Sequence, residues 1–131
     1  MEDKVTRKEF VDAVGFMADQ VWDFHERWGL PPFDCSKKSA KMAISERQHI
    51  LEEEITELSD AVKSGNTTEI SDEVADVLFV AIGHAQSLLS SGIVGIKRVT
   101  IKNAKKTKQT HKIRPDTGKL LPIIGKPHKW L

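Results

Sequence analysis

Residues 51–82, LEEEITELSDAVKSGNTTEISDEVADVLFVAI, contain two apolar-periodic segments that are separated by a short turn sequence. Apolar residues recur at spacings of three and four in each segment, which is typical of amphipathic helices. The apolar stripes are Leu51, Ile55, Leu58 and Val62 in the first segment, and Ile70, Val74, Val77 and Ala81 in the second. This pattern predicts two antiparallel helices that pack against each other through their stripes.

A pair of carboxylates accompanies each stripe. On a helical wheel of about 100° per residue, Glu54 and Glu57 lie at two defined offsets from the first stripe. Glu73 and Asp76 lie at the same offsets, and on the same side, of the second stripe. Packing through the stripes would therefore point four carboxylates into one space.

Carboxylates that converge in this way repel one another, so they either take up protons or bind a cation. Oxygen ligands without His or Cys favour hard ions, which predicts Mg²⁺ as the metal, with Mn²⁺ able to substitute. A glutamate-rich stretch such as residues 52–57 is also typical of a solvated helix face, and this alternative stays open for the first pair. It fits Glu73 and Asp76 less well, because they border the mostly apolar residues 74–85. Acidic side chains are seldom fully buried unless they are paired or bound to metal.

Length and composition favour a single helical domain. The chain has 131 residues, of which 39% are hydrophobic and 6% aromatic, a size that supports one modest core. We expect one domain over residues 1–131, with residues 109–131 as a basic C-terminal arm. No apolar run approaches the roughly 20 residues that a membrane span requires. The charged first ten residues do not resemble a signal peptide, and Cys35 has no second cysteine to pair with, so we expect a cytoplasmic protein without a membrane partner.

Two further helices complete the expected all-α bundle of four main helices. Residues 5–28 have apolar residues at helical spacing, and Gly29, followed by two prolines, ends this helix. Residues 93–108 have a weaker apolar stripe and form the last helix. After residue 109 the periodicity is lost, and Asp116 to Lys119 has the composition of a turn in an irregular arm.

The first residues of the two central helices are predicted from N-terminal capping residues. The first central helix is expected to begin between Ser39 and Ser45, because Ser45 to Gln48 has the form of a capping box, although a start one turn earlier stays open. Thr67 or Thr68 is expected to cap the second.

The net charge of +1 is the sum of two unlike parts. From Lys102 onward there are nine Lys/Arg and one acidic residue, a net charge of +8, whereas the preceding part has a net charge of −7. Such a basic segment can bind nucleic acid, or can bring cations to a polyphosphate held at an acidic metal site.

Four motifs in this order resemble the MazG-like, all-alpha nucleoside triphosphate pyrophosphohydrolases. They are FHERWGLP at 24–31, Glu53-Glu54-x-x-Glu57 followed by Glu73-x-x-Asp76, NAKK at 103–106 and RPDTGK at 114–119. The resemblance implies Mg²⁺-dependent hydrolysis of a nucleoside triphosphate to the monophosphate and pyrophosphate. It also implies an all-helical bundle that assembles as a homodimer or homotetramer.

The resemblance further implies roles for single residues. Glu54, Glu57, Glu73 and Asp76 would hold the metal, and Glu53 would orient or deprotonate the attacking water. Asn103 and Lys106 would lie near the triphosphate, with Arg114 and Lys119 as further candidates. Arg47, near the metal helix, is another candidate for substrate contact. Five side chains could line a base pocket: Trp22, Phe24, His25, Trp28 and Phe33. For Trp22 and His25 the alternative of ordinary interface or surface residues stays open.

Two alternatives remain at this stage. One is the related phosphoribosyl-ATP pyrophosphohydrolase, which the aromatic first helix and the basic arm make a poorer match. The other is a non-enzymatic helical module that binds nucleic acid through the basic tail. No recognition-helix or RNA-binding motif supports it, so nucleic acid is not the expected partner.

Overall fold

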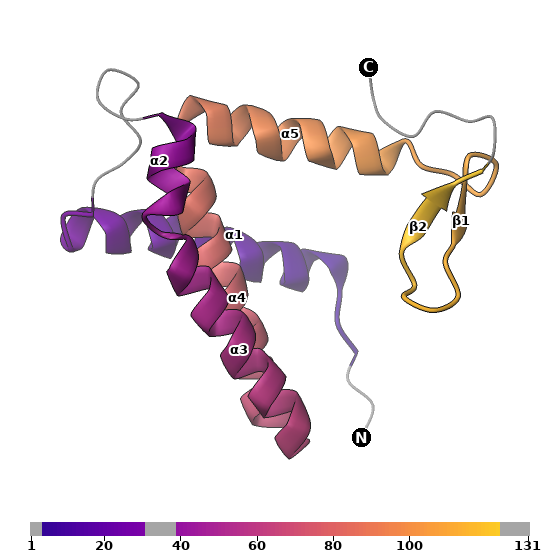
Figure 1. Ribbon diagram of the computed structural model, residues 1–131, viewed down its shortest axis with the longest axis horizontal. Coiled ribbons are helices and arrows are strands. Elements are labelled where there is room, and N and C mark those ends of the chain that lie inside the picture. Colours follow the sequence, from indigo (N-terminus) through magenta and orange to yellow (C-terminus); the bar gives the residue numbers. More distant parts are fainter. Residues whose placement is uncertain (1–3, 31–38, 124–131) are drawn as a thin grey trace. The chain divides into compact units, whose positions relative to one another are not determined.

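The computed structural model describes residues 4–30 and 39–123, which form five helices and two short strands (Figure 1). In chain order these are α1 (Arg7–Arg27), α2 (Ala40–Ser45), α3 (Gln48–Ser64), α4 (Thr67–Ser87), α5 (Ser90–Ala104), β1 (His111–Ile113) and β2 (Leu120–Pro122). The chain divides into two compact units, Met1–Ile93 and Val94–Leu131. The mostly helical structure confirms the predicted class. Cys35, Phe33 and the end of the basic arm lie outside the described residues.

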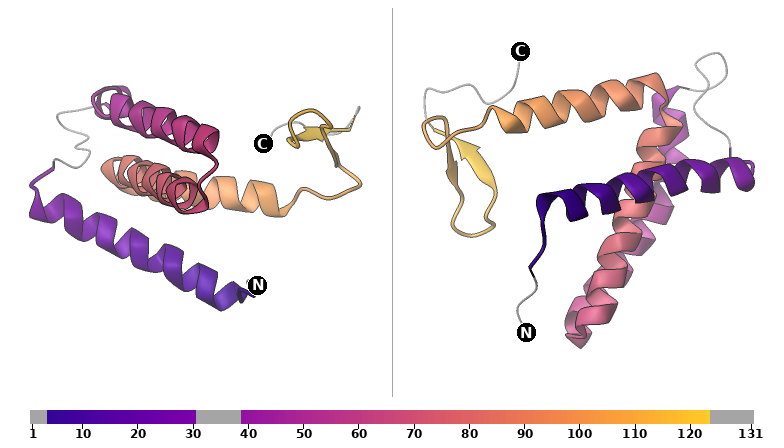
Figure 2. Two further views of the ribbon diagram at one scale, coloured as in Figure 1. Left: turned by 90° about the horizontal axis from the view of Figure 1, so that it is seen from below. Right: turned by 180° about the vertical axis from the view of Figure 1, so that it is seen from behind.

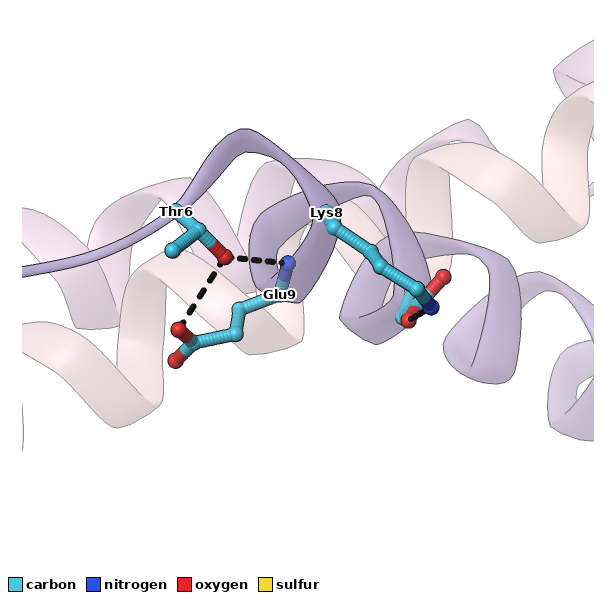
Figure 3. A network of polar contacts seen from close by, with 4 residues as sticks. Thr6, Lys8 and Glu9 are labelled. Carbon is cyan, nitrogen blue, oxygen red and sulfur yellow. Dashed lines mark hydrogen bonds and ion pairs between the residues drawn. The ribbon is translucent and has the colours of Figure 1, made fainter.

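Helix α1 begins with a reciprocal cap at Thr6 (Figure 3). The Thr6 hydroxyl accepts a hydrogen bond from the Glu9 backbone N–H at 3.1 Å, and it donates to the Glu9 carboxylate at 3.0 Å. In the same first turn, Lys8 forms an ion pair with Asp12, four residues further along the helix, at 2.6 Å. The cap satisfies a backbone donor that would otherwise lack a partner, and the negative Glu9 lies where the helix dipole favours it.

The end of α1 agrees with the predicted stop at Gly29. Gly29 has φ of +63°, a conformation that L side chains rarely adopt. Its N–H donates to the Glu26 carbonyl, and the Leu30 N–H donates to the His25 carbonyl at 2.9 Å. These two bonds form a Schellman motif, which closes the helix and turns the chain away.

The first central helix differs from the prediction because it is broken at Glu46 and Arg47. Ser39 caps the short α2 by accepting from the Met42 N–H, so the helical segment starts a turn before the expected box at Ser45. Helix α3 then starts at Gln48 without a side-chain cap. The capping box at Ser45 is therefore wrong, whereas the earlier start, which the predicted range from Ser39 to Ser45 included, is confirmed. The predicted cap at Thr67 or Thr68 is also wrong, since Asn66 accepts from the Glu69 N–H and caps α4.

In the first unit, α3 and α4 lie side by side and antiparallel, joined by the turn at Gly65 (Figure 1). Helix α1 packs across α4 on the side away from α3, so that α4 lies between them (Figure 2). The short α2 contacts both α3 and α4. Among the described residues no helix combines the length and the apolar character needed to cross a membrane.

The buried core of the described residues is small. Its hydrophobic members are Val21, Ala43 and Ala61, with Val21 fully inaccessible to solvent. The predicted stripes are only partly buried, because Ile55 and Val62 on α3 are 48% and 58% exposed and Val74 on α4 is also exposed. The other stripe residues are half-buried: Leu51, Leu58, Ile70, Val77 and Ala81. The single chain therefore covers the predicted stripes only in part, and Ala61 is the residue of α3 that is buried.

The second unit contains a β-hairpin that the sequence reading did not predict. Strands β1 and β2 pair antiparallel, with His111 opposite Pro122 and Ile113 opposite Leu120. The expected turn at Asp116 to Lys119 lies between them, and Gly118 adopts φ of +73°. The predicted arm is therefore partly regular over the residues described.

Two glycines offer a matched test of the helix boundaries. Gly65 has φ of +73° at the end of α3, whereas Gly15 is helical and has open space where a Cβ would lie. We expect Gly65→Ala to destabilise the protein by about 1–2 kcal/mol, because an L residue is strained in the left-handed region. Gly15→Ala should stabilise it by about 0.5–1 kcal/mol. Urea denaturation measures both, and shifts of the same sign would contradict this account.

Candidate functional site

The packing of α3 on α4 brings three glutamates together. Glu54 and Glu57 from α3 and Glu73 from α4 each offer a carboxylate oxygen, and these atoms lie within 4.8 Å of one another. Glu54 and Glu57 are one turn apart on α3, so they share a face, and the antiparallel α4 presents Glu73 to that face. The structure therefore brings together three of the four carboxylates that the helical wheels predicted to converge.

The fourth carboxylate, Asp76, borders this cluster. Its side chain is exposed, and it is not among the residues whose ligand atoms meet within 4.8 Å. Its negative charge nevertheless acts on Glu54 and Glu73. Asp76 lies one turn after Glu73 on α4, which places it next to the cluster on the same helix.

Two oxygens of the cluster lack hydrogen-bond partners. One carboxylate oxygen of Glu54 and one of Glu73 are buried without a hydrogen-bond partner. Burial raises the pKa of both carboxyls, and the negative charges of Glu57 and Asp76 raise it further. Crowded carboxylates with unpartnered oxygens are a binding environment for protons or for a hard cation.

A shallow hollow of about 280 Å³ adjoins the cluster. Five residues line it: Glu57, Asp60, Ala61, Glu69 and Glu73. Asp60 and Glu69 were not singled out in the sequence, although their spacing indicates them. Asp60 follows Glu57 by three residues and Glu69 precedes Glu73 by four, so each extends the acidic face of its helix by about a turn.

Arg47 lies in a partly buried group with residues from α1 and α4. Its Nη2 is 3.3 Å from Nε2 of His25, which is only 7% exposed. Because arginine only donates, His25 accepts through Nε2 and is neutral in this contact. Burial lowers the pKa of His25, and the positive charges of Arg47 and His84 lower it further. Burial also lowers the pKa of Arg47, whose Nε has no partner.

Gly83 of α4 makes room for this pair. A Cβ at residue 83 would lie 2.9 Å from Nε2 of His25 and 3.4 Å from Nη2 of Arg47. Nδ1 of His84 donates a hydrogen bond to the Val80 carbonyl at 2.9 Å, while its Nε2 is buried without a partner. The sequence reading did not single out Gly83, because its effect depends on the crossing of α1 over α4.

The remaining predicted substrate residues belong to the end of α1 and to the second unit. Trp28 caps α1 and is 68% exposed, with its ring 6.3 Å from that of Phe24. The other four belong to the second unit: Asn103, Lys106, Arg114 and Lys119. There Arg114 forms an ion pair with Asp116 at 2.8 Å, and its backbone N–H bonds the Lys119 carbonyl in the hairpin. Their roles stay predictions.

Comparison with known families gives a match that covers the acidic helices. The model of the MazG nucleotide pyrophosphohydrolase domain matches residues 44–114, more than half of the chain. The chain belongs to the MazG nucleotide pyrophosphohydrolase family. This match includes Arg47, all the proposed metal ligands and the Asn103–Lys106 motif. Neither the curated proteins nor the solved structures gave a match.

The crowding of carboxylates predicts that Glu73→Gln increases the thermal stability of the protein, and that the increase depends on pH. A carboxyl whose pKa is raised on folding binds its proton more tightly in the folded state. The contribution of Glu73 to the free energy of unfolding therefore falls as the pH rises from 4.5, the ordinary pKa of this carboxyl, through its raised pKa. At higher pH the contribution stays unfavourable. Without metal, we expect Glu73→Gln to melt above the wild type at pH 7.5, and the difference to vanish near pH 4.

Thermal melts in EDTA across this pH range measure the effect. Glu52→Gln removes the same charge from an exposed position of α3 outside the three-residue cluster, so it serves as the matched control. We expect a smaller and flatter difference for this variant. A Glu73→Gln protein that is less stable than the wild type at neutral pH would argue against repulsion in the cluster.

Proposed function

We propose that the protein is a Mg²⁺-dependent hydrolase that converts nucleoside or deoxynucleoside triphosphates to the monophosphate and pyrophosphate. The observation that supports this most is the meeting of Glu54, Glu57 and Glu73 within 4.8 Å in a chain of this family. Acting on free nucleotides in the cytoplasm, such an enzyme would cleanse or balance the nucleotide pool.

The donor set fits the proposed metal. Glu54, Glu57 and Glu73 would hold Mg²⁺, with Asp76 as the adjacent fourth ligand, and Mn²⁺ would fit the same oxygen ligands. When bound, the metal would neutralise phosphate oxygens and lower the pKa of a coordinated water. The unpartnered oxygens of Glu54 and Glu73 supply the uncompensated negative charge that such an ion requires.

Other residues of the chain would position substrate and water. Glu53 is exposed on α3 immediately before Glu54, and we assign it the acceptance of a proton from the attacking water. Arg47, whose Nε has no partner, would hold a phosphate oxygen with its remaining donors. Further cationic and amide groups for the polyphosphate would come from Asn103, Lys106, Arg114 and Lys119, and Trp28 and His25 would contact the nucleoside.

Assembly as a homodimer or homotetramer is part of this proposal. The first unit exposes apolar side chains on α1, α3 and α4, including Phe16 at 68%, Ile55 at 48% and Leu78 at 40%. Exposed apolar residues that follow helical stripes are typical of helix–helix interfaces between subunits. A second copy would bury the part of the predicted stripes that the single chain leaves exposed.

A substrate panel tests the activity. We expect the protein with Mg²⁺ to release pyrophosphate, and no orthophosphate, from at least one of the common nucleoside or deoxynucleoside triphosphates. Glu73→Gln and Asp76→Ala should each lower kcat/KM by about 100-fold, because each weakens the hold on the metal that would neutralise the phosphate oxygens. Glu52→Gln should retain activity. Including phosphoribosyl-ATP in the panel tests the alternative substrate, and release of orthophosphate alone would refute the proposal.

Light scattering coupled to size-exclusion chromatography tests the assembly. The expected mass is two or four times that of the 14.7-kDa chain. Ile55→Lys should shift the protein toward monomer, since it places a charge on the exposed stripe of α3. Thr56→Lys adds the same charge at the next position, where the side chain is exposed and polar, and should leave the mass unchanged. A monomeric wild type at micromolar concentration would exclude the proposed assembly.

A further inference from the structure

A buried group of basic side chains lies where α1 crosses α4. It consists of His25 of α1, His84 of α4 and Arg47, which directly precedes α3. The two histidines are only 7% and 9% exposed, and the charges of Arg47 and His84 both act on the His25 ring. All three residues belong to the first unit. The group therefore combines one permanent cation with two imidazoles that can accept hydrogen bonds when neutral.

The contact between Arg47 and His25 requires a neutral imidazole. Nη2 of Arg47 lies 3.3 Å from Nε2 of His25. A guanidinium only donates hydrogen bonds, so Nε2 of His25 must accept and must carry no proton. A protonated ring would direct an N–H at the guanidinium and bring two positive charges together. The contact therefore exists in one protonation state of His25.

Helix α4 restricts the position of both partners in this contact. A Cβ at residue 83 would lie 2.9 Å from Nε2 and 3.0 Å from Cε1 of His25, and 3.4 Å from Nη2 of Arg47. The edge of the imidazole and the tip of the guanidinium thus both lie against the α4 backbone at Gly83. A buried ring that packs against a backbone has few other positions, so it can hold its hydrogen-bond partner in one orientation.

The contact with His25 leaves other donors of Arg47 available. An arginine has five N–H groups, and Nε of Arg47 is buried without a hydrogen-bond partner. A buried donor without a partner is unfavourable, and a phosphate oxygen would satisfy it. Because His25 already orders the guanidinium, less side-chain entropy is lost when an anion binds. The arrangement is that of an arginine held ready for an anionic ligand.

We propose that His25 is a positioning residue for polyphosphate binding, whose neutral imidazole holds the guanidinium of Arg47 in the orientation that binds phosphate oxygens. The inference rests on the proposed function, because it takes Arg47 to contact the polyphosphate. It is a different role from contact with the nucleoside, since it acts through Arg47 and does not involve the base. Affinity for inorganic pyrophosphate, which has no nucleoside, therefore depends on His25.

A double-mutant cycle on the full chain tests this role, with the affinity for inorganic pyrophosphate in Mg²⁺ measured by calorimetry at pH 7.5. His25→Leu removes the acceptor and should weaken binding about tenfold, the size of one hydrogen bond to a charged group. Arg47→Ala should weaken binding at least as much. Adding His25→Leu to Arg47→Ala should weaken it no further, because the effect of His25 passes through Arg47.

Two further variants separate positioning from packing. His25→Gln has nearly the size of the leucine variant but keeps a side-chain acceptor, so it should recover most of the affinity that His25→Leu loses. His49→Gln makes the same change at an exposed position of α3, two residues after Arg47, and should leave the affinity unchanged. Equal losses in His25→Leu and His25→Gln would overturn the role of the acceptor.

A measurement on the wild-type protein tests the contact without any substitution. Burial lowers the pKa of His25 below its ordinary value of 6.5, and the charges of Arg47 and His84, from the elements that face the ring, lower it further. Protonation removes the acceptor, so the Nε resonance of Arg47 should shift with the same midpoint as the His25 ring in an NMR titration. An Arg47 resonance that does not follow His25 would overturn the inference.

The outcomes separate this inference from the proposed function. A loss of affinity from His25→Leu that persists in the Arg47→Ala protein would overturn positioning, and release of pyrophosphate from a triphosphate would show the activity intact. Coupling between His25 and Arg47 in the cycle, without turnover of any triphosphate, would support positioning and refute the activity. An Arg47→Ala protein that binds pyrophosphate as the wild type does would overturn the inference outright.

Discussion

The close approach of α3 and α4 at their acidic faces is the constraint on which the first unit depends. It gathers the carboxylates of Glu54, Glu57 and Glu73 within 4.8 Å and leaves oxygens of Glu54 and Glu73 buried without partners. Such an arrangement opposes folding, because like charges repel and buried carboxylates lose hydration. A sequence selected only for stability would separate these groups. Their convergence is therefore better explained by a ligand that carries positive charge.

The side chains around the cluster permit this approach. Ala61 is 6% exposed and lies in the wall of the acidic hollow, between the glutamates that α3 and α4 contribute. A small residue there allows the helix backbones to come close, as small side chains do at other helix contacts. The larger apolar residues Ile55 and Val62 of the same helix are exposed. The single chain thus buries the small residue and leaves these larger ones for an external surface.

Much of the site could be predicted from helical periodicity because the key spacings are local. The relation of Glu54 to Glu57 and of Glu73 to Asp76 follows from the geometry of one helix, and a short turn ensures that α3 and α4 are antiparallel neighbours. The burial of the stripes could not be read in the same way. A wheel identifies the apolar face of a helix but not the element that covers it, and in the single chain that face is partly uncovered at Ile55.

Features that depend on one residue or on distant segments were the ones missed. Asn66 caps a helix that Thr67 or Thr68 was expected to cap, since several adjacent residues have similar capping propensity. The hairpin of β1 and β2 consists of strands of three residues each, too short for a periodic signal. The contact of His25 with Arg47 requires α1 to cross α4, and no local pattern encodes that crossing.

Gly83 shows how such a crossing can couple separate parts of the site. Because residue 83 has no Cβ, the His25 ring can lie against α4, where a Cβ would be only 2.9 Å from its Nε2. The same ring atom faces Arg47 at the start of α3. The position of α1 on α4 therefore sets the position of the guanidinium at α3, through a single imidazole. A side chain at residue 83 would act on Arg47 without touching the carboxylates. A substitution there would therefore perturb the basic half of the proposed site and leave the acidic half in place.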